Sequence, residues 1–239
     1  MKLLNNLYQV GGTSLSHGFD ASAYLLKDAR GYLLIDCGTP EGYAQIVQNI
    51  RSLGVNPGEI HTILATHGHY DHVGAANLWR RDFGCRLLVH PLDREQVEAG
   101  DSALTSASLL YGVEAEPTAV DGVLDTGDVF PVEGGSLEVL HTPGHTRGSV
   151  VFILTQGTDR VLIAGDTIWG GYSEKIGSDE GLWRDSLARI TARHYDYYTF
   201  GHIGPQLLAD ADRRLAEARM QFANYYNPWF RRFDQHYRY

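Results

Sequence analysis

Apolar positions in this chain follow two periods, one typical of strands and one typical of helices. Short runs rich in β-branched residues predict strands over 6–10, 21–27, 32–36, 60–65, 86–90, 136–141, 148–155, 160–164 and 197–200. Apolar residues three and four positions apart predict helices over 40–53, 73–83, 91–98, 180–193 and 205–224. For the helix over 40–53, Thr39 is the expected cap and Pro40 lies in the first turn.

A strand-then-helix order recurs in both halves of the chain. From Asp121 onward, glycines separate short strands, as in a β-meander. The sequence contains no repeat of fixed short period and no low-complexity segment. We therefore expect a single domain over 1–239, with αβ halves at about 1–120 and 121–239 that form two stacked sheets flanked by helices.

Composition narrows the class of protein. The 239 residues carry a net charge of −9, with 43% apolar and 21% charged residues, which is ordinary for a globular chain. Mild acidity without a long basic run disfavours a nucleic-acid partner. The N-terminus does not resemble a signal peptide, and no stretch is apolar enough to span a bilayer, so no membrane partner is expected. Two cysteines, Cys37 and Cys85, give no disulfide framework, which favours a cytoplasmic location.

Residues 66–72, Thr-His-Gly-His-Tyr-Asp-His, place three imidazoles and a carboxylate on one loop after a predicted strand. Neutral imidazole and carboxylate are ligands that zinc, iron and manganese accept. In an extended segment His67, His69 and Asp71 would point to one side, and the next residue would diverge. We therefore expect the first two histidines to share one metal, and Asp71 and His72 to reach a second metal nearby.

Three later strand ends supply further candidate ligands. His145 follows a Pro-Gly pair that forces a tight loop. Asp166 ends a buried apolar strand; a lone Asp there often caps a helix, but two metals need a bridging anion. His202 lies in a Gly-flanked turn. His141 is a rival to His145, although its place inside the strand favours a packing role. Cys37, with no adjacent base, is interpreted as a small packing residue rather than a nucleophile.

Together these motifs resemble the metallo-β-lactamase superfamily, and the resemblance covers nearly the whole chain. It implies an α/β (α+β) fold, the four-layer αββα sandwich with a dinuclear site at the edge of its two sheets. It implies two sets of metal ligands and a bridge: His67, His69 and His145 for one metal; Asp71, His72 and His202 for the other; and Asp166 as the bridge. Asp36 stands where the family has an acid that orients the ligand loop without binding metal.

The resemblance also implies a chemistry. Two Zn²⁺ per chain, with iron or manganese as alternatives, would activate a hydroxide that attacks an ester, thioester or lactone carbonyl of a small-molecule acyl substrate. Asp71 is the candidate catalytic residue, as a proton shuttle. The motif at 141–146 is most similar to the glyoxalase II-like branch, although the basic helical domain that holds glutathione there has no counterpart. An acyl-homoserine-lactone-type lactonase and an iron-dependent persulfide dioxygenase are the alternatives.

Three variable stretches are expected to decide the substrate. Residues 101–118 form a candidate lid. Residues 168–183 combine glycines with aromatic side chains, which suits either an apolar acyl group or a packed surface loop. The tail 225–239 is dense in aromatic residues and arginine, and it is expected to pack or to form a homodimer contact rather than to bind a membrane.

Overall fold

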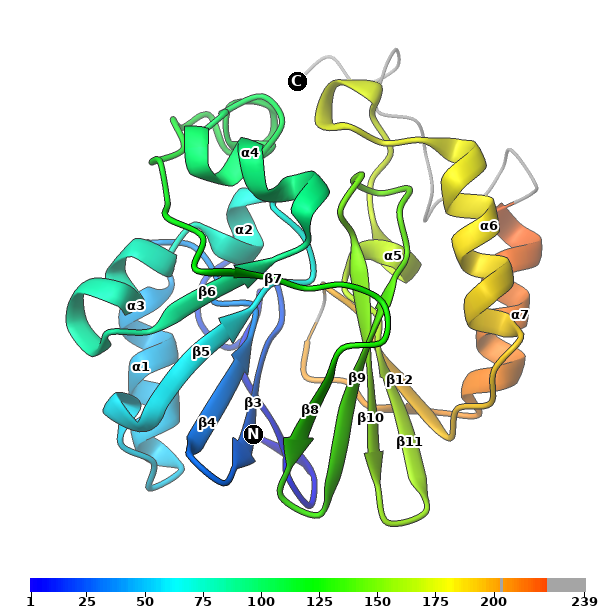
Figure 1. Cartoon of the computed structure of the whole chain (residues 1–239), viewed down its shortest axis with the longest axis horizontal. Helices are drawn as coiled ribbons and strands as arrows, with labels where there is room; N and C mark the ends of the chain where they lie inside the picture. The colour runs from blue at the N-terminus through cyan, green and yellow to red at the C-terminus, as the bar shows by residue number, and fades with distance from the viewer. Residues whose placement is uncertain (203, 223–239) are drawn as a thin grey trace.

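Two β-sheets face each other in the computed structural model, which describes residues 1–202 and 204–222 apart from the side chain of Trp169 (Figure 1). The first sheet follows chain order and contains Lys2–Leu4 (β1), Leu7–Gly11 (β2), Ala23–Asp28 (β3), Gly31–Ile35 (β4), Ile60–Leu64 (β5), Arg86–Val89 (β6) and Gly122–Val123 (β7). The second contains Val129–Val132 (β8), Gly135–His141 (β9), Val150–Gln156 (β10), Asp159–Ile163 (β11), Tyr197–Thr199 (β12) and Leu208–Ala209 (β13), in the spatial order β13-β12-β11-β10-β9-β8.

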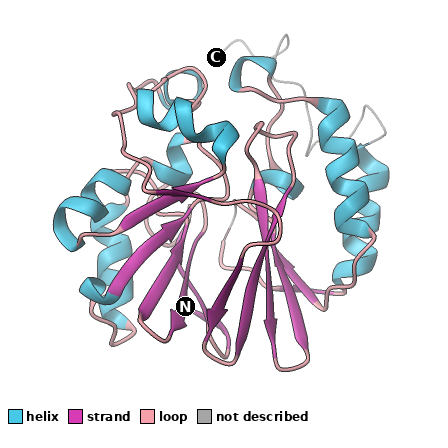
Figure 2. Ribbon diagram, viewed as in Figure 1, coloured by secondary structure: helices cyan, strands magenta, loops and turns pink. Residues whose placement is uncertain are grey.

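Helices cover the outer faces of both sheets (Figure 2). Tyr43–Ser52 (α1) and Ala76–Phe83 (α3) flank the first sheet, and Glu180–Thr191 (α6) and Ala211–Phe222 (α7) flank the second. The shorter helical segments are Pro57–Glu59 (η1), Tyr70–Val73 (α2), Pro91–Ala99 (α4), the π-helical Ala107–Tyr111 (η2), Asp166–Trp169 (α5) and Glu174–Ile176 (η3).

Apolar side chains fill three layers between these elements. Leu64, Phe152 and Ile163 belong to a cluster between the two sheets. Ile46 and Trp79 belong to a second cluster, which joins α1 and α3 to the first sheet. A third cluster joins α6 and α7 to the second sheet. The order helix, sheet, sheet, helix is the predicted αββα sandwich.

Strand direction brings the candidate ligands to one edge of the sandwich. β4 pairs parallel with β5, and β11 pairs parallel with β12. Because the carboxyl ends of parallel strands lie side by side, the loops that follow β4 and β5 begin together, as do those that follow β11 and β12. These loops carry Asp36, residues 66–72, Asp166 and His202.

Two predicted helix boundaries are wrong. α1 begins at Tyr43 rather than near Pro40, because Asp20 accepts hydrogen bonds from the backbone N–H (2.8 Å) and hydroxyl (2.6 Å) of Thr39 and holds the preceding turn outside the helix. The helix expected over 205–224 begins at Ala211, because Leu208 pairs with Tyr198 as strand β13.

Two predictions concerned the membrane and the C-terminal tail. None of the helices described in the structure has both the length and the apolarity needed to cross a membrane. The predicted packing or dimer contact of residues 225–239 lies outside the described residues.

Candidate metal centre

The loop after β5 is held by the carboxylate of Asp36. The backbone N–H of Thr66 donates to Asp36 Oδ1 (2.7 Å), and the Thr66 hydroxyl donates to Oδ2 (2.8 Å). His72 Nδ1–H donates to the same Oδ2 (2.8 Å). A histidine that uses Nδ1 in this way presents Nε2 to the site. Asp36 therefore contacts the ligand loop as expected and fixes which nitrogen of His72 is available.

The expectation of an extended loop through His72 is wrong for its second half. His69 is extended (ψ 152°), but residues Tyr70–Val73 form the short helix α2. A helix this short has no visible period in the sequence. Asp71 and His72 nevertheless approach each other, with Asp71 Oδ2 3.4 Å from His72 Nε2. The helical conformation therefore also places the two residues close enough to share a metal.

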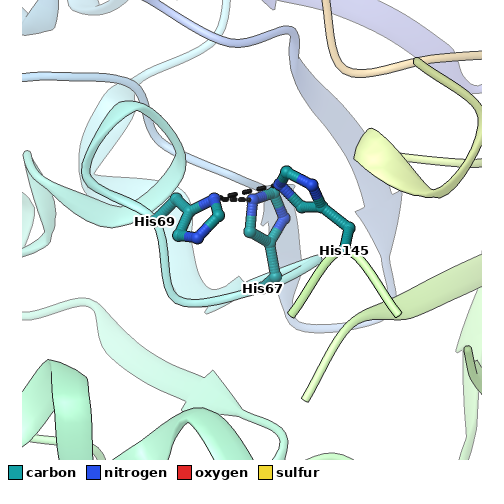
Figure 3. A group of neighbouring side chains, drawn as sticks. All are labelled: His67, His69 and His145. Atoms are coloured by element: carbon teal, nitrogen blue, oxygen red, sulfur yellow. Dashed lines mark hydrogen bonds between the residues drawn. The ribbon is translucent and has the colours of Figure 1, made fainter. Parts of the chain in front are cut away.

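Three histidines converge from the two halves of the chain (Figure 3). His69 Nδ1 lies 3.0 Å from His67 Nε2 and 2.9 Å from His145 Nε2. His145 Nδ1–H donates to the carbonyl of Gly171 (2.9 Å), which turns Nε2 toward the other two rings. Neighbouring ligands of a tetrahedral zinc ion lie about 3.3 Å apart, given Zn–N bonds near 2.0–2.1 Å. The three nitrogens are therefore spaced as one face of such a site.

A second group of ligand atoms adjoins the first. His202 Nε2 lies 3.3 Å from Asp71 Oδ2 and 3.2 Å from Asp166 Oδ2. Asp166 Oδ2 is also 3.4 Å from His145 Nε2, and Asp166 Oδ1 is 3.4 Å from His72 Nε2. One carboxylate thus reaches both groups. Potential ligand atoms lie within 4.8 Å of one another in three sets: His67, His69 and His145; His67, His72 and Asp166; and Asp71, His72 and His202.

Burial and neighbouring charges set the protonation states of these candidate ligands. Burial lowers the pKa of His69 and of His145 to about 4, so both are neutral near pH 7. For Asp71, burial alone would raise the pKa, but His72 and His202 lower it to about 2. Burial alone would lower the pKa of His72, but the carboxylates of Asp71, Asp36 and Asp166 raise it well above its ordinary value. A metal at this second group would displace a proton from His72.

The donor set fits divalent metal ions. His72 Nε2 and Asp166 Oδ1 are fully buried, and neither has a hydrogen-bonding partner of good geometry among the described residues. A buried polar atom without a partner costs about 1–3 kcal/mol, and a metal ion bound at these two atoms would remove that cost. Imidazole nitrogens and carboxylate oxygens in this number suit zinc, iron or manganese.

A pocket of about 240 Å³ opens onto both groups. One wall contains His69, Asp71, His145, Asp166 and His202, and the rest is formed by Leu109, Leu110, Tyr111, Gly171, Ser173 and Ile176. Burial raises the pKa of Tyr111 far above its ordinary value, and Asp71, which its hydroxyl contacts, raises it further. The candidate lid 101–118 thus reaches the pocket through η2. Within 168–183, Gly171, Ser173 and Ile176 line the pocket, whereas Tyr172 and Trp183 are buried in the core.

The structure brings together all seven predicted ligands, and it separates His141 from them. The His141 ring stacks on His90, with ring centroids 3.8 Å apart, and its Nε2–H donates to the carbonyl of Arg147 (2.9 Å).

Cys37 is fully buried, and burial raises its thiol pKa well above the ordinary value, which fits a packing residue. Sequence reasoning placed Tyr111 only within the candidate lid, and it missed Asp93, which forms no ligand motif and whose partners lie far away in the sequence.

The chain belongs to the metallo-beta-lactamase superfamily, whose profile matches residues 18–202. A probable metallo-hydrolase of Bacillus subtilis, YqgX, is 30% identical over 191 residues, covering 78% of this chain and 86% of the relative. A hydroxyacylglutathione hydrolase of a Bradyrhizobium species is 28% identical over 211 residues, covering 81% of this chain and 72% of the relative.

The mycobacterial relatives are shorter matches. The uncharacterized protein Rv2581c of Mycobacterium tuberculosis is 37% identical over 134 residues, covering 54% of this chain and 60% of the relative's length. Among solved structures, the metallo-beta-lactamase GOB-18 of Elizabethkingia meningoseptica aligns with a TM-score of 0.74 at 26% identity, covering 94% of this chain and 90% of that one. This likeness agrees with the αββα fold.

Proposed function

We propose that this chain is a binuclear metallo-hydrolase that cleaves a thioester or lactone of small size. One observation carries the proposal: a three-histidine group and an aspartate-histidine group share the carboxylate of Asp166 at the wall of one pocket. In this assignment His67, His69 and His145 hold one ion, Asp71, His72 and His202 hold the other, and Asp166 bridges them. We propose Zn²⁺ as the ion, with iron or manganese as alternatives.

The residues around the proposed ions have separate tasks. When bound, divalent ions supply a water nucleophile at neutral pH and polarise an acyl carbonyl. Asp71, ionised and 3% exposed, is placed to accept a proton at Oδ2 and to return it to the leaving group. The Tyr111 hydroxyl stays protonated and donates its hydrogen bond to the carboxylate of Asp71, which holds that carboxylate at the pocket.

The pocket supports an acyl substrate over a phosphodiester. Leu109, Leu110 and Ile176 give the pocket apolar lining beside the candidate ligands, and no lysine or arginine is among the described residues that line the pocket. An anionic nucleic acid would need cationic side chains near the metals, whereas an acyl chain needs apolar contact. The hydroxyacylglutathione hydrolase among the relatives supports the thioester, and a lactone is the competing substrate because it presents the same carbonyl chemistry.

A substrate panel on reconstituted protein tests the proposal. The chain is loaded with zinc or with iron and assayed with thioesters, lactones and phosphodiesters, with oxygen uptake followed in parallel. We expect hydrolysis of a thioester or lactone and no oxygen consumption. Phosphodiester cleavage alone, or oxygen uptake with a persulfide, would contradict the assignment. His69→Ala and Asp166→Ala should lose metal and turnover together; full activity without metal loss would refute the proposed ligand set.

A further inference from the structure

The two ligand loops of the three-histidine group come from different sheets. His67 and His69 follow β5 of the first sheet, whereas His145 lies between β9 and β10 of the second. A tetrahedral site tolerates displacements of only a few tenths of an ångström in ligand position. Some interaction must therefore hold the loops at a fixed separation. A backbone hydrogen bond from Val150 N–H to the carbonyl of Thr66 (2.8 Å) joins the chain at the strand ends, but it does not reach the histidine-bearing parts of the loops.

Asp93 joins the two loops beside the histidines themselves. Its Oδ2 accepts hydrogen bonds from the backbone N–H of Gly68 (2.8 Å) and from the hydroxyl of Thr146 (2.7 Å). Its Oδ1 accepts a hydrogen bond from the backbone N–H of Gly148 (2.8 Å). Gly68 lies between His67 and His69, and Thr146 follows His145. One carboxylate thus contacts the chain next to all three imidazoles, through two backbone N–H groups and a hydroxyl.

The site around Asp93 is built to the size of its carboxylate. Asp93 is 1% exposed and lies in the first turn of α4. A Cβ on Gly148 would lie 2.6 Å from Asp93 Cγ, and a Cβ on Gly68 would lie 2.7 Å from Gln96 Nε2. At Gly148 the loop therefore approaches α4 more closely than a residue with a side chain would permit, whereas at Gly68 a side chain would require the end of Gln96 to move. Three donors on a buried carboxylate form a rigid unit, since charge-assisted hydrogen bonds are roughly twice as strong as neutral ones.

We propose that Asp93 is a positioning residue that fixes His145 relative to His67 and His69, and so sets the metal affinity of the three-histidine group. This inference rests on the metal ligands assigned under the proposed function. Asn at this position keeps the shape of Asp93 but replaces an acceptor by an NH₂ donor. Whichever oxygen is replaced, the NH₂ group faces a backbone N–H, so at least one of the three hydrogen bonds is lost and the loops shift apart.

The test compares metal binding by the full chain carrying Asp93→Asn with binding by the unmodified chain. Zinc affinity is measured by chelator competition, and the coordination geometry is followed by the visible spectrum of the Co²⁺-loaded protein. We expect the zinc equivalent bound by the three-histidine group to bind about 10–100-fold more weakly, as for other residues that orient metal ligands, with an altered Co²⁺ spectrum. Thr146→Val removes one of the three hydrogen bonds at nearly constant volume and should show a smaller loss in the same direction.

Asn6→Ala is the matched control for a loss of stability alone. Asn6 is also buried and also ties the sheets together, through Nδ2–H donation to the carbonyls of Lys27 (2.8 Å) and Glu133 (3.1 Å), but at the edge opposite the metal groups. It should destabilise the fold and leave zinc affinity and the Co²⁺ spectrum unchanged. Wild-type affinity and spectrum in both Asp93→Asn and Thr146→Val would overturn the inference, as would equal losses in Asn6→Ala. If the unmodified chain binds no metal, the proposed function itself fails.

Discussion

Asp36→Asn tests how the structure selects the ligand atom of His72. Asp36 has φ 55°, a left-handed conformation that Asn tolerates as well as Asp, so the backbone is expected to stay in place. Asp36 Oδ2 accepts from both Thr66 Oγ1 and His72 Nδ1 (2.8 Å each). An NH₂ group in place of Oδ2 would donate to His72 Nδ1 and move the ring proton to Nε2, the atom that faces the site. An NH₂ group in place of Oδ1 would instead face the N–H of Thr66.

Either orientation of the amide introduced by Asp36→Asn has a cost that can be estimated. The group that orients a metal-binding histidine contributes about 10–100-fold to metal affinity, or about 1.4–2.7 kcal/mol. We expect a loss of this size for the equivalent bound at His72 in a zinc titration by calorimetry. Asp28→Asn is the control, because Asp28 Oδ2 pairs with His61 Nε2 (3.0 Å) in another aspartate-histidine contact away from the site. Two equivalents bound to Asp36→Asn with unchanged affinity would refute the reasoning.

Three further predictions concern the core, the pocket and pH. Phe152→Ala, fully buried between the sheets, should lower the free energy of unfolding by about 3–5 kcal/mol in a denaturant titration; a loss under about 1 kcal/mol would contradict the packing described. Leu110→Ala, at a position 47% exposed, should lower kcat/KM for long acyl chains more than for acetyl, with the free energy of unfolding unchanged within about 0.5 kcal/mol. An equal effect on both substrates would mean that Leu110 does not contact the acyl chain. Burial and the neighbouring His141 lower the pKa of His90 to about 4, below the unfolded value near 6.5. The stability that depends on neutral His90 is therefore present above pH 6.5 and is lost as the pH falls toward 4. His90→Asn in metal-free protein should reduce the slope of that part of the stability curve, to which His69 and His145 also contribute, and an unchanged slope would count against it.

The candidate ligand set could be predicted from the sequence because residues of ligand type recur at strand ends, where the chain must turn. His67, His69 and Asp71 stand within five residues, and His145, Asp166 and His202 each follow an apolar run next to glycine. The αββα layers follow from the same alternation of strand and helix periods. The superfamily match and the solved structures confirm the family and the αββα fold, whereas the ligand set stays a prediction.

What the sequence leaves out depends on contacts between distant residues. Asp93 falls inside the predicted helix 91–98 with no ligand motif around it, and its partners Gly68 and Gly148 lie 25 and 55 positions away. Leu208 fits a helical stripe by spacing, but pairing with β12 decides its conformation. In both cases tertiary hydrogen bonds outweigh the local pattern.

Metal stoichiometry measured together with turnover tests the central claim most directly. Metal-free protein is titrated with Zn²⁺, and the initial rate of thioester or lactone hydrolysis is recorded at each addition. Shared use of Asp166 by the two groups predicts that the rate rises until about two equivalents are bound and then stays constant. A rate that is maximal without zinc, or that never rises although two equivalents bind, would contradict a binuclear hydrolase.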